Sequence, residues 1–459
     1  MFCDCLNDTK ETRANFNVCP ICLAHPGALP TINHEAVRAV VRLGIALKGK
    51  TPPLSKFDRK NYFYPDLPKG YQLSQYDLPF VLGGELTGVK ITRVHLEEDT
   101  GRLDHATDGS TLVDYNRAGR ALMELVTEPV IKTADEALVF AKELQLILKY
   151  LDISDADMEH GLMRVEANVS VSTDPNKLGT KVEVKNINSF RAVRDTIAYE
   201  IKRQEEVLES GGKVVQETRG WDDVKQITYS QRLKEQAHDY RYLPEPDLPP
   251  IKISKEELNE LRVSLPELPE QKRVRFMREF GLSRAQVNVL VDDRWLAAYY
   301  EQVMSELLRE VRGAGVAKDV KLSILALNYL TSDLMGVMAS SGVGLREIKI
   351  TAENFAELIG LVAQGQLSSR SAKDILGMMF KTGGDPHEFM KSGNMAQVSD
   401  EGELKKTVLE IIEKNPGIVA DYKKGKAPAI EALIGRAMGA LKGRGNPEVL
   451  RRLFLENIS

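Results

Sequence analysis

The sequence predicts an α+β protein with a mixed or antiparallel sheet and helices in the N-terminal half and only helices beyond it. Three observations support this class. The chain has 459 residues, more than one hydrophobic core usually holds. Short β-like runs alternate with helical patterns up to about residue 252, whereas the pattern beyond Ser254 is almost entirely helical. Between them, residues 244–250 are rich in proline, which favours an extended connector.

These patterns predict three domains: residues 1–253, residues 254–395 and residues 396–459. Breaks within the helical part are expected at residues 383–386 and 394–399. The net charge of -4 gives no whole-chain preference for a polyanionic partner. No stretch approaches the roughly 20 apolar residues of a membrane span, and no signal pattern opens the chain, so a cytoplasmic location is expected.

Three helices are expected in the first domain, over residues 34–48, 134–150 and 190–210, where apolar residues recur at helical spacing. Thr133 and Glu136 form a capping box before the second helix. A glycine pair ends the third.

Residues 44–51 match the phosphate-binding pattern G-x-x-x-x-G-K-T. That loop should follow a strand and open a helix. Gly44 instead lies inside a predicted helix, and two prolines follow the match. We therefore expect the match to arise by chance.

All four cysteines lie within the first 22 residues, as a C-x-C pair and a C-x-x-C pair. Two such pairs can surround one tetrahedral zinc ion, and in a reducing compartment such clustering favours metal over disulfides. Four thiolate ligands leave no open position for substrate, which predicts a structural role; four unrelated reduced thiols are the alternative. The predicted ligands are Cys3, Cys5, Cys19 and Cys22.

A β-hairpin is predicted from residues 164–171 and 181–184, on either side of a turn-rich segment. Alternation places Glu166 and Lys185 among the polar residues of the two strands and the apolar residues on the opposite face. Carboxylates beside lysines can hold magnesium and neutralise phosphate, although a salt-bridged exposed sheet has the same composition. Three successive acids at residues 97–99 end another alternating strand, where a cation would relieve their repulsion.

Cations alternate with aromatic residues over residues 57–66, and residues 239–244 repeat this mixture. It suits stacking on bases and pairing with phosphates at the single-stranded end of an RNA. Aromatic core residues flanked by solvated charges are the alternative.

The C-terminal segment from residue 419 onward has eight basic and four acidic residues in a chain of net charge -4. This asymmetry suits a phosphate backbone, and a solvated helix face is the alternative. Glycines beside the cations would allow close approach of a nucleic-acid backbone. The predicted contacts are Lys423, Lys424, Lys442 and Arg444.

Eight strings carry a resemblance to a known family. They lie at residues 17–22, 26–30, 57–66, 70–77, 95–99, 164–170, 183–190 and 238–247. Together they closely resemble the B subunit family of the glutamyl-tRNA(Gln) and aspartyl-tRNA(Asn) amidotransferase, over nearly the whole chain. The middle and the tail look like that family's helical domain and its small tRNA-binding end.

The resemblance implies a cradle-shaped catalytic domain that uses ATP and magnesium to activate the side-chain carboxylate of glutamate or aspartate mischarged on tRNA. Ammonia would then form the amide, after release by the amidase subunit of a complex that also holds a small third subunit. The implied catalytic or magnesium-binding residues are Glu98, Glu124, Glu166 and Lys185, and the implied phosphate- or tRNA-binding residues are Arg59, Lys60, Tyr62 and Tyr64.

The sequence departs from the family pattern in two respects. Members usually begin with a metal-binding strand reading G-x-E-x-H, and this sequence starts after that segment. Many relatives have aspartate at Glu166 and glutamate at His160. A non-catalytic tRNA-docking scaffold is therefore one alternative, and an unrelated ATP-dependent ligase for a small acid is another. The sequence does not distinguish glutamate from aspartate as the natural substrate.

Overall fold

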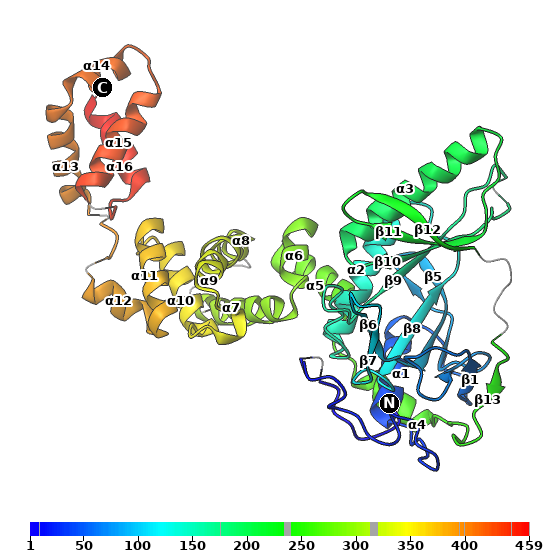
Figure 1. The fold of residues 1–459 in the computed structure, drawn as a ribbon. Helices are drawn as coiled ribbons and strands as arrows, with labels where there is room; N and C mark the ends of the chain where they lie inside the picture. The colour runs from blue at the N-terminus through cyan, green and yellow to red at the C-terminus, as the bar shows by residue number, and fades with distance from the viewer. Residues whose placement is uncertain are drawn as a thin grey trace. The chain divides into compact units, whose positions relative to one another are not determined.

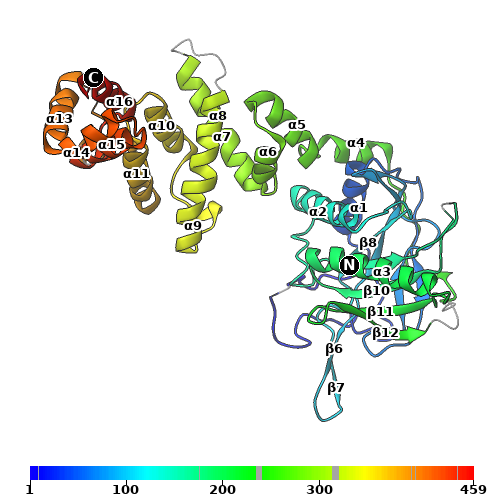
Figure 2. The same cartoon turned by 90° about the horizontal axis from the view of Figure 1, so that it is seen from above.

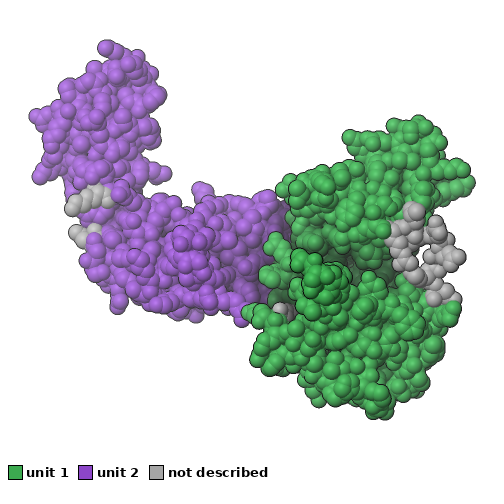
Figure 3. Space-filling view, in the orientation of Figure 1, with its two compact units in different colours: residues 1–268 green, residues 269–459 purple. Residues whose placement is uncertain are grey.

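The computed structural model describes residues 1–8, 10–174, 176–233, 240–312, 320–393, 395–398, 400–441 and 443–458. The chain divides into two compact units, Met1–Leu268 and Pro269–Ser459 (Figure 3). The strands among the described residues all lie in the first unit, and the second is built of helices (Figure 1). The predicted α+β class is confirmed, while the domain boundaries at residues 253 and 395 remain predictions.

The longest strand of the first unit, β5 (Val89–Glu98), pairs with three others. It runs antiparallel to β8 (Ala121–Thr127) along most of its length. It also pairs with the short strands β3 (Val81–Leu82) and β4 (Glu85–Leu86). Val89, as well as the rest of the apolar residues of β5, is buried, so the strand forms part of the hydrophobic core.

Two smaller groups of strands adjoin this sheet. One has the order β13-β1-β2, with bounds Leu243–Pro244, Asp58–Asn61 and Tyr71–Ser74. Its outer strand includes the first proline of the proline-rich segment and pairs within the first unit. The rest of that segment is not extended throughout, as the prediction had it, because residues 246–248 form a turn. The other group is the hairpin of β6 (Arg102–His105) and β7 (Thr111–Asp114), which projects from the unit (Figure 2).

A second four-stranded sheet contains the predicted hairpin. Strands β9 (Val165–Val169) and β10 (Val182–Ile187) are antiparallel, with apolar residues buried on one face, as expected. Strand β11 (Glu217–Asp222) runs parallel to β10. Strand β12 (Ile227–Leu233) pairs antiparallel with β11 and forms the edge of the sheet. The hairpin contains a bulge at Asn186, whose φ of 64° is unusual for a residue other than glycine.

The three predicted helices of the first unit are confirmed as α1 (His34–Ala46), α2 (Ala134–Tyr150) and α3 (Phe190–Glu209). Both hydrogen bonds of the capping box before α2 are present. A fourth helix, α4 (Lys255–Val263), contacts α1. The apolar faces of α1 and α2 pack with β5 in one core.

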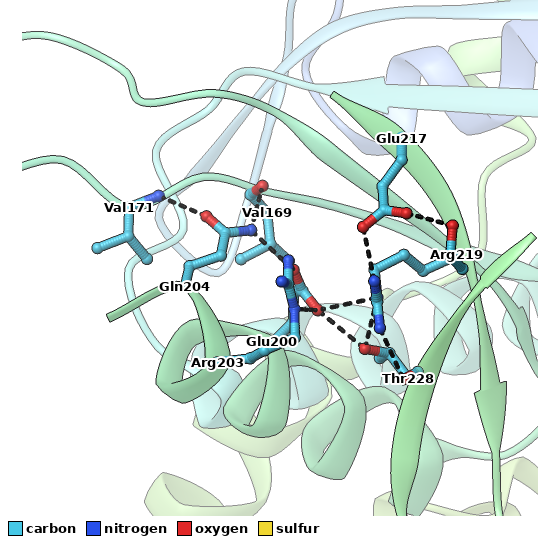
Figure 4. A network of polar contacts seen from close by, with 9 residues as sticks. Val169, Val171, Glu200, Arg203, Gln204, Glu217, Arg219 and Thr228 are labelled. Carbon is cyan, nitrogen blue, oxygen red and sulfur yellow. Dashed lines mark hydrogen bonds and ion pairs between the residues drawn. The ribbon is translucent and has the colours of Figure 1, made fainter. Parts of the chain in front are cut away.

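A buried polar network fixes α3 to its sheet (Figure 4). Glu200 has no exposed surface, and its carboxylate accepts hydrogen bonds from Arg203, Gln204 and Thr228. Arg219 lies 3.8 Å from the same carboxylate and forms a 2.6 Å ion pair with another glutamate. Each charge in the network therefore has a partner.

The phosphate-loop match is a packing feature. Gly44 lies inside α1, as expected from its sequence context. A Cβ atom on Gly44 would come within 2.4 Å of Val81, and one on Gly49 within 2.6 Å of the same side chain. Close contact between α1 and β3 therefore requires both glycines.

The second unit is almost entirely helical, as predicted from residue 254 onward. Its elements are α5 (Pro269–Phe280), α6 (Arg284–Val291), α7 (Arg294–Arg312), α8 (Val320–Asn328), the π-helix η1 (Tyr329–Leu334), α9 (Met335–Ser341), the 3-10 helix η2 (Leu345–Glu347), α10 (Ala352–Ala363), α11 (Ser369–Thr382), α12 (Pro386–Ser392), α13 (Glu401–Lys414), α14 (Pro416–Lys423), α15 (Pro428–Ala440) and α16 (Pro447–Ile458).

Both expected breaks within the helical part are present. Gly383 ends α11 with a φ of 79°, and Pro386 begins α12. The second break separates α12 from α13, where residues 395–398 are extended. Beyond it, α13, α15 and α16 share a hydrophobic core of their own.

One expectation about apolar segments is wrong. The helical run Lys321–Ser341 is long and apolar enough to cross a membrane by length and composition alone. It arises because α8, η1 and α9 follow one another without a break. Only part of this run is buried: Ala326, Leu330 and Leu334 have little exposed surface, and 39% of its apolar window lies inside the protein.

Candidate functional site

The pairing of β5 with β8 gathers an imidazole and two carboxylates on one face of the sheet. His95 and Glu97 alternate onto this face, and Glu124 lies opposite His95 in the register. One ligand atom from each of the three lies within 4.8 Å of the others. His95 and Glu97 are buried, while Glu124 is exposed. We call these three residues the acid group.

Hydrogen bonds and nearby charges shift the pKa values of the two carboxylates in opposite directions. Burial alone would raise the pKa of Glu97, but the bond from His95, the charge of Lys60 and the hydroxyl of Ser74 lower it to about 2. Partial shielding from solvent and the neighbouring Glu97 raise the pKa of Glu124. A cation between the two carboxylates would stabilise both in the charged form.

His95 has one unused hydrogen-bonding atom. Its Nε2 lies 3.2 Å from Glu97 Oε1, whereas Nδ1 is buried and has no hydrogen-bond partner in the part of the chain that the structure describes. Such buried atoms are uncommon in folded proteins and call for an explanation. The carboxylates supply the oxygen donors that magnesium prefers, and the imidazole adds a nitrogen donor, so the acid group fits a divalent cation.

Glu98 points to the opposite face of β5. Its carboxylate accepts hydrogen bonds from Lys69 Nζ at 2.5 Å and from the backbone N–H of Leu73 at 2.8 Å. It is buried and lines a cavity of about 280 Å³ together with Cys3 and Tyr71. Glu98 is thus a separate carboxylate from the acid group.

Glu166 and Lys185 lie in the second sheet and contact each other. The Lys185 Nζ is 3.1 Å from Glu166 Oε1 and 3.8 Å from Glu183 Oε1. Burial would lower the pKa of Lys185, but the two carboxylates and Tyr240 raise it. Within the described chain, neither Glu166 nor Glu98 joins the acid group within reach of one ion.

An aromatic side chain connects the acid group with the second sheet. The ring of Tyr240 lies 5.1 Å from Lys60 Nζ, and Lys60 Nζ lies 3.9 Å from Glu97. Tyr240 also raises the pKa of Lys185 through its electrostatic interaction with the ammonium group. Figure 3 shows a recess in the first unit, between the part that contains α3 in Figure 1 and the rest of the unit. Two lysines thus flank one tyrosine beside the acid group.

The other residues predicted from the cation–aromatic string have different surroundings. Arg59 forms a bidentate pair with Glu245, at 2.7 and 2.8 Å, so its charge is used inside the fold. The hydroxyl of Tyr62 donates to Gln72 at 3.3 Å. Tyr64 is exposed and available to a partner.

The four cysteines converge as predicted from their spacing. The sulfur of Cys22 lies 3.3 Å from Cys3, 3.6 Å from Cys19 and 3.7 Å from Cys5. A tetrahedral zinc ion with sulfur ligands at about 2.3 Å separates them by about 3.7 Å. Burial together with the bond to Cys3 raises the pKa of Cys22 to about 11, and a bound cation would oppose that shift. The donor set therefore fits zinc.

The predicted tail cations fall into three classes. Lys423 and Lys424, at the end of α14, are exposed and form no ion pair within the described residues. Arg444 is half-buried, and the backbone carbonyl of this residue accepts a bond from Val398. Lys442 lies outside the described residues.

Sequence reasoning did not select His95 and Glu97 as site residues, although both lie in a string that carried the family resemblance. The signal that could have identified them is the alternation of side chains along a strand, in which every second residue points to the same face. From Arg93 to Glu97, beyond the register shift that follows Ile91, the odd-numbered residues of β5 share a face, and pairing with β8 brings Glu124 to that face. Glu98, one residue later, must point the other way.

Two family models match parts of this chain. Residues 1–259 match the GatB/GatE catalytic domain, and residues 313–458 match the GatB domain. The B subunit of aspartyl/glutamyl-tRNA(Asn/Gln) amidotransferase from Thermomicrobium roseum is 44% identical, over 99% of this chain and 94% of the relative. Proteins of the same name from Caldanaerobacter subterraneus subsp. tengcongensis and Carboxydothermus hydrogenoformans are 43% and 41% identical, over 100% of this chain and 96% and 95% of the relatives. The chain therefore belongs to the family of aspartyl/glutamyl-tRNA(Asn/Gln) amidotransferase B subunits.

Proposed function

We propose that this chain activates the side-chain carboxylate of glutamate or aspartate mischarged on tRNA, by phosphoryl transfer from ATP, so that ammonia can form the amide. The observation that carries the proposal is the acid group of His95, Glu97 and Glu124, with Lys60 beside it. Carboxylates next to a cation are the arrangement that nucleotide phosphates require. The family membership supports the same reaction.

The reaction proceeds in two balanced steps. A substrate carboxylate oxygen attacks the terminal phosphorus of ATP, and the bond to the bridging oxygen breaks, giving an acyl phosphate and ADP. The nitrogen lone pair of ammonia then attacks the carbonyl carbon. Inorganic phosphate leaves with the bonding electrons and takes up a proton from the nitrogen. Activation is needed because a carboxylate oxygen is a poor leaving group.

We assign the magnesium-binding role to Glu97 and Glu124, with His95 beside them, in preference to Glu98 and Glu166. Magnesium bound there would neutralise charge on the ATP phosphates. Lys60 lies 3.9 Å from Glu97 and would stabilise a phosphate oxygen next to it.

Lys185 would take part from the second sheet. Its raised pKa keeps it protonated at neutral pH, and its ion pair with the half-exposed Glu166 can open toward an incoming phosphate. Glu166 would thereby orient Lys185 rather than bind the metal.

The acceptor end of the tRNA would bind near the exposed aromatic side chains of the first unit. Phe63, Tyr64 and Tyr76 are all largely exposed, and Tyr62 lies beside Lys60. Exposed rings stack on unpaired bases, and lysines pair with phosphates. Lys423, Lys424 and Arg444 would contact the tRNA backbone from the tail.

The remaining assignments concern stability and partners. Zinc bound by the four cysteines would have a structural role, because four protein ligands leave no open position. The name shared by the relatives is that of one subunit of an enzyme. We propose that this chain works in the cytoplasm with an amidase subunit, which releases ammonia, and with a small third subunit.

The test is hydrolysis of ATP by the assembled complex, measured with and without mischarged tRNA. We expect hydrolysis that depends on both magnesium and mischarged tRNA, and its loss in Glu97→Gln. Hydrolysis without tRNA would favour a ligase for a small acid, and tRNA binding without hydrolysis would favour a docking scaffold. Full activity of Glu97→Gln together with loss in Glu98→Gln would return the ligand role to Glu98.

A further inference from the structure

Among the described residues, an arginine on the same strand face as the acid group has no hydrogen-bond or ion-pair partner. Arg93 precedes His95 and Glu97 at two-residue spacing, so all three side chains leave β5 on one side. The Arg93 Nε is buried without a hydrogen-bond partner. In the part of the chain that the structure describes, no carboxylate lies within ion-pair distance of its guanidinium.

The surroundings place this guanidinium at the acid group. Its charge lowers the pKa of both Glu124 and Tyr242, against the shielding from solvent that raises them. Arg93 is half-buried, and in the register its neighbours across the strands are Val126 and Leu82. Aliphatic neighbours offer no acceptor for a guanidinium N–H.

Two other partly buried arginines of the first unit have carboxylate acceptors. Arg59 holds Glu245 with two hydrogen bonds, and Arg117 holds Asp99 with two. Leaving a guanidinium partly buried without an acceptor costs free energy. Arg93 differs from these two, and an anion that arrives from outside the chain would provide the missing acceptor.

We propose that Arg93 binds a phosphate group of ATP at the acid group and holds it for transfer to the substrate carboxylate. This inference rests on the proposed function. The planar guanidinium presents paired N–H donors that match two oxygens of one phosphate. The acid group supplies negative charge for a cation, and Arg93 supplies positive charge for the anion, so a metal–nucleotide complex would satisfy both.

The experiment uses the complete complex with Arg93→Gln, Arg93→Lys and the control Lys90→Gln, which alters an exposed lysine on the same strand. Mischarged-tRNA-dependent release of ADP is measured against ATP concentration and, separately, against tRNA concentration. Binding of a non-hydrolysable ATP analogue is measured by equilibrium dialysis. Thermal unfolding and the amidase activity of the partner report whether each variant folds and assembles.

We expect Arg93→Gln to lower kcat/KM for ATP by about tenfold or more, the range for a lost charged hydrogen bond, and to weaken analogue binding. Arg93→Lys should recover part of the loss, because it restores charge without the paired donors. The KM for mischarged tRNA and the amidase activity should stay within twofold of the unaltered complex, and Lys90→Gln should match that complex in every measurement.

Three results would overturn the inference. One is an Arg93→Gln complex with ATP parameters within twofold of the unaltered complex. Another is a rise in KM confined to mischarged tRNA, which would assign the arginine to the substrate carboxylate or the tRNA backbone. The third is a loss of ATP turnover in Arg93→Gln that is matched by equal losses of amidase activity and thermal stability, which would make the arginine structural. The proposed function fails on a different result, ATP hydrolysis by the unaltered complex that does not depend on mischarged tRNA. An unaffected Arg93→Gln complex whose hydrolysis still depends on mischarged tRNA contradicts this inference alone.

Discussion

The charged groups around Glu200 and on the face of β5, both in the first unit, differ in how well their hydrogen bonds are satisfied. Around Glu200, the carboxylate oxygens accept from an arginine, an amide and a hydroxyl, and the group is closed. On the face of β5, by contrast, His95 Nδ1 and Arg93 Nε have no hydrogen-bond partner among the described residues. One group lies between α3 and the second sheet and the other on the first sheet. Both contain buried residues, so burial alone does not distinguish them.

The difference indicates what each group does. A satisfied buried network stabilises one arrangement of the chain. On β5, the carboxylates have acceptor oxygens without a cation, and Arg93 has a donor without an acceptor. A ligand that brings both a cation and an anion would satisfy both. We therefore expect substitutions in the two groups to affect different quantities, stability around Glu200 and activity on β5.

The largest effect is expected from Glu124→Gln. We expect it to lower tRNA-dependent ATP hydrolysis by about 10²- to 10³-fold, because it removes a charged ligand from the transition state. Its raised pKa means that ionisation at neutral pH opposes folding, so the metal-free variant should be at least as stable as the unaltered protein. Thermal unfolding in a chelator checks the second point. A large loss of stability would place Glu124 with Glu200 as a structural carboxylate.

The next effect is expected from Glu200→Ala. Removing this carboxylate leaves Arg203 and Arg219 partly buried without a common partner, and breaking a buried pair typically costs about 3–5 kcal/mol. Urea unfolding at neutral pH should show the loss. Activity per folded molecule should stay close to normal, and an unaltered unfolding midpoint would contradict the structural role.

A smaller effect tests Arg59, which the sequence predicted as a phosphate or tRNA contact. We expect Glu245→Gln to lower the free energy of unfolding by about 1–3 kcal/mol at pH 7. Burial would raise the pKa of Glu245, but the hydrogen bonds from Arg59 outweigh it, so this pKa lies below its ordinary value of 4.5. The stabilisation is present above that value and is lost as the pH falls through the lowered pKa.

Unfolding of both proteins in denaturant, from pH 7 down to the acid range, checks the prediction. The gap between them should shrink below pH 4.5, the ordinary value of this carboxyl group. A gap that stays constant with pH would show that charge is not the source of the stabilisation, and Arg59 would again be available to tRNA.

The smallest effect is expected at the surface of the tail. The double variant Lys423→Gln, Lys424→Gln should weaken tRNA binding by a few-fold, with a salt dependence lower by about 1.4–1.8 in the log–log slope. The control is Lys405→Gln, Lys406→Gln, which removes the same charge from exposed positions on α13. Filter binding over a salt series compares them. Equal slopes for the two variants would mean that Lys423 and Lys424 contribute no more to tRNA binding than other exposed lysines do.

Much of the fold could be predicted because the signals are local. The cap before α2 uses residues three apart, and the glycine after α11 adopts the left-handed conformation that ends a helix. The hairpin of β9 and β10 followed from period-two alternation. The parallel pairing of β10 with β11 was not predicted, because it joins segments separated by a long helix.

The candidate site was predicted only in part, for the same reason. Glu124 was identified, but whether Glu97 or Glu98 lies next to it depends on strand parity and on register with β8. The partners of Arg59 and Glu98 are determined by contacts over more than 20 residues of sequence. The cysteines were the exception, because their spacing along the chain already limits how four sulfurs can meet.

Strand β5 separates two chemically different sides, with Glu97 on one and Glu98 on the other. If β5 shifted by one residue along β8, every side chain of the strand would move to the other face. Glu98 would then join the acid group, and Glu97 would face the cavity. Insertions or deletions within residues 89–98 should therefore be eliminated during evolution. Changes in length should accumulate instead at the exposed turn of residues 106–110, between β6 and β7.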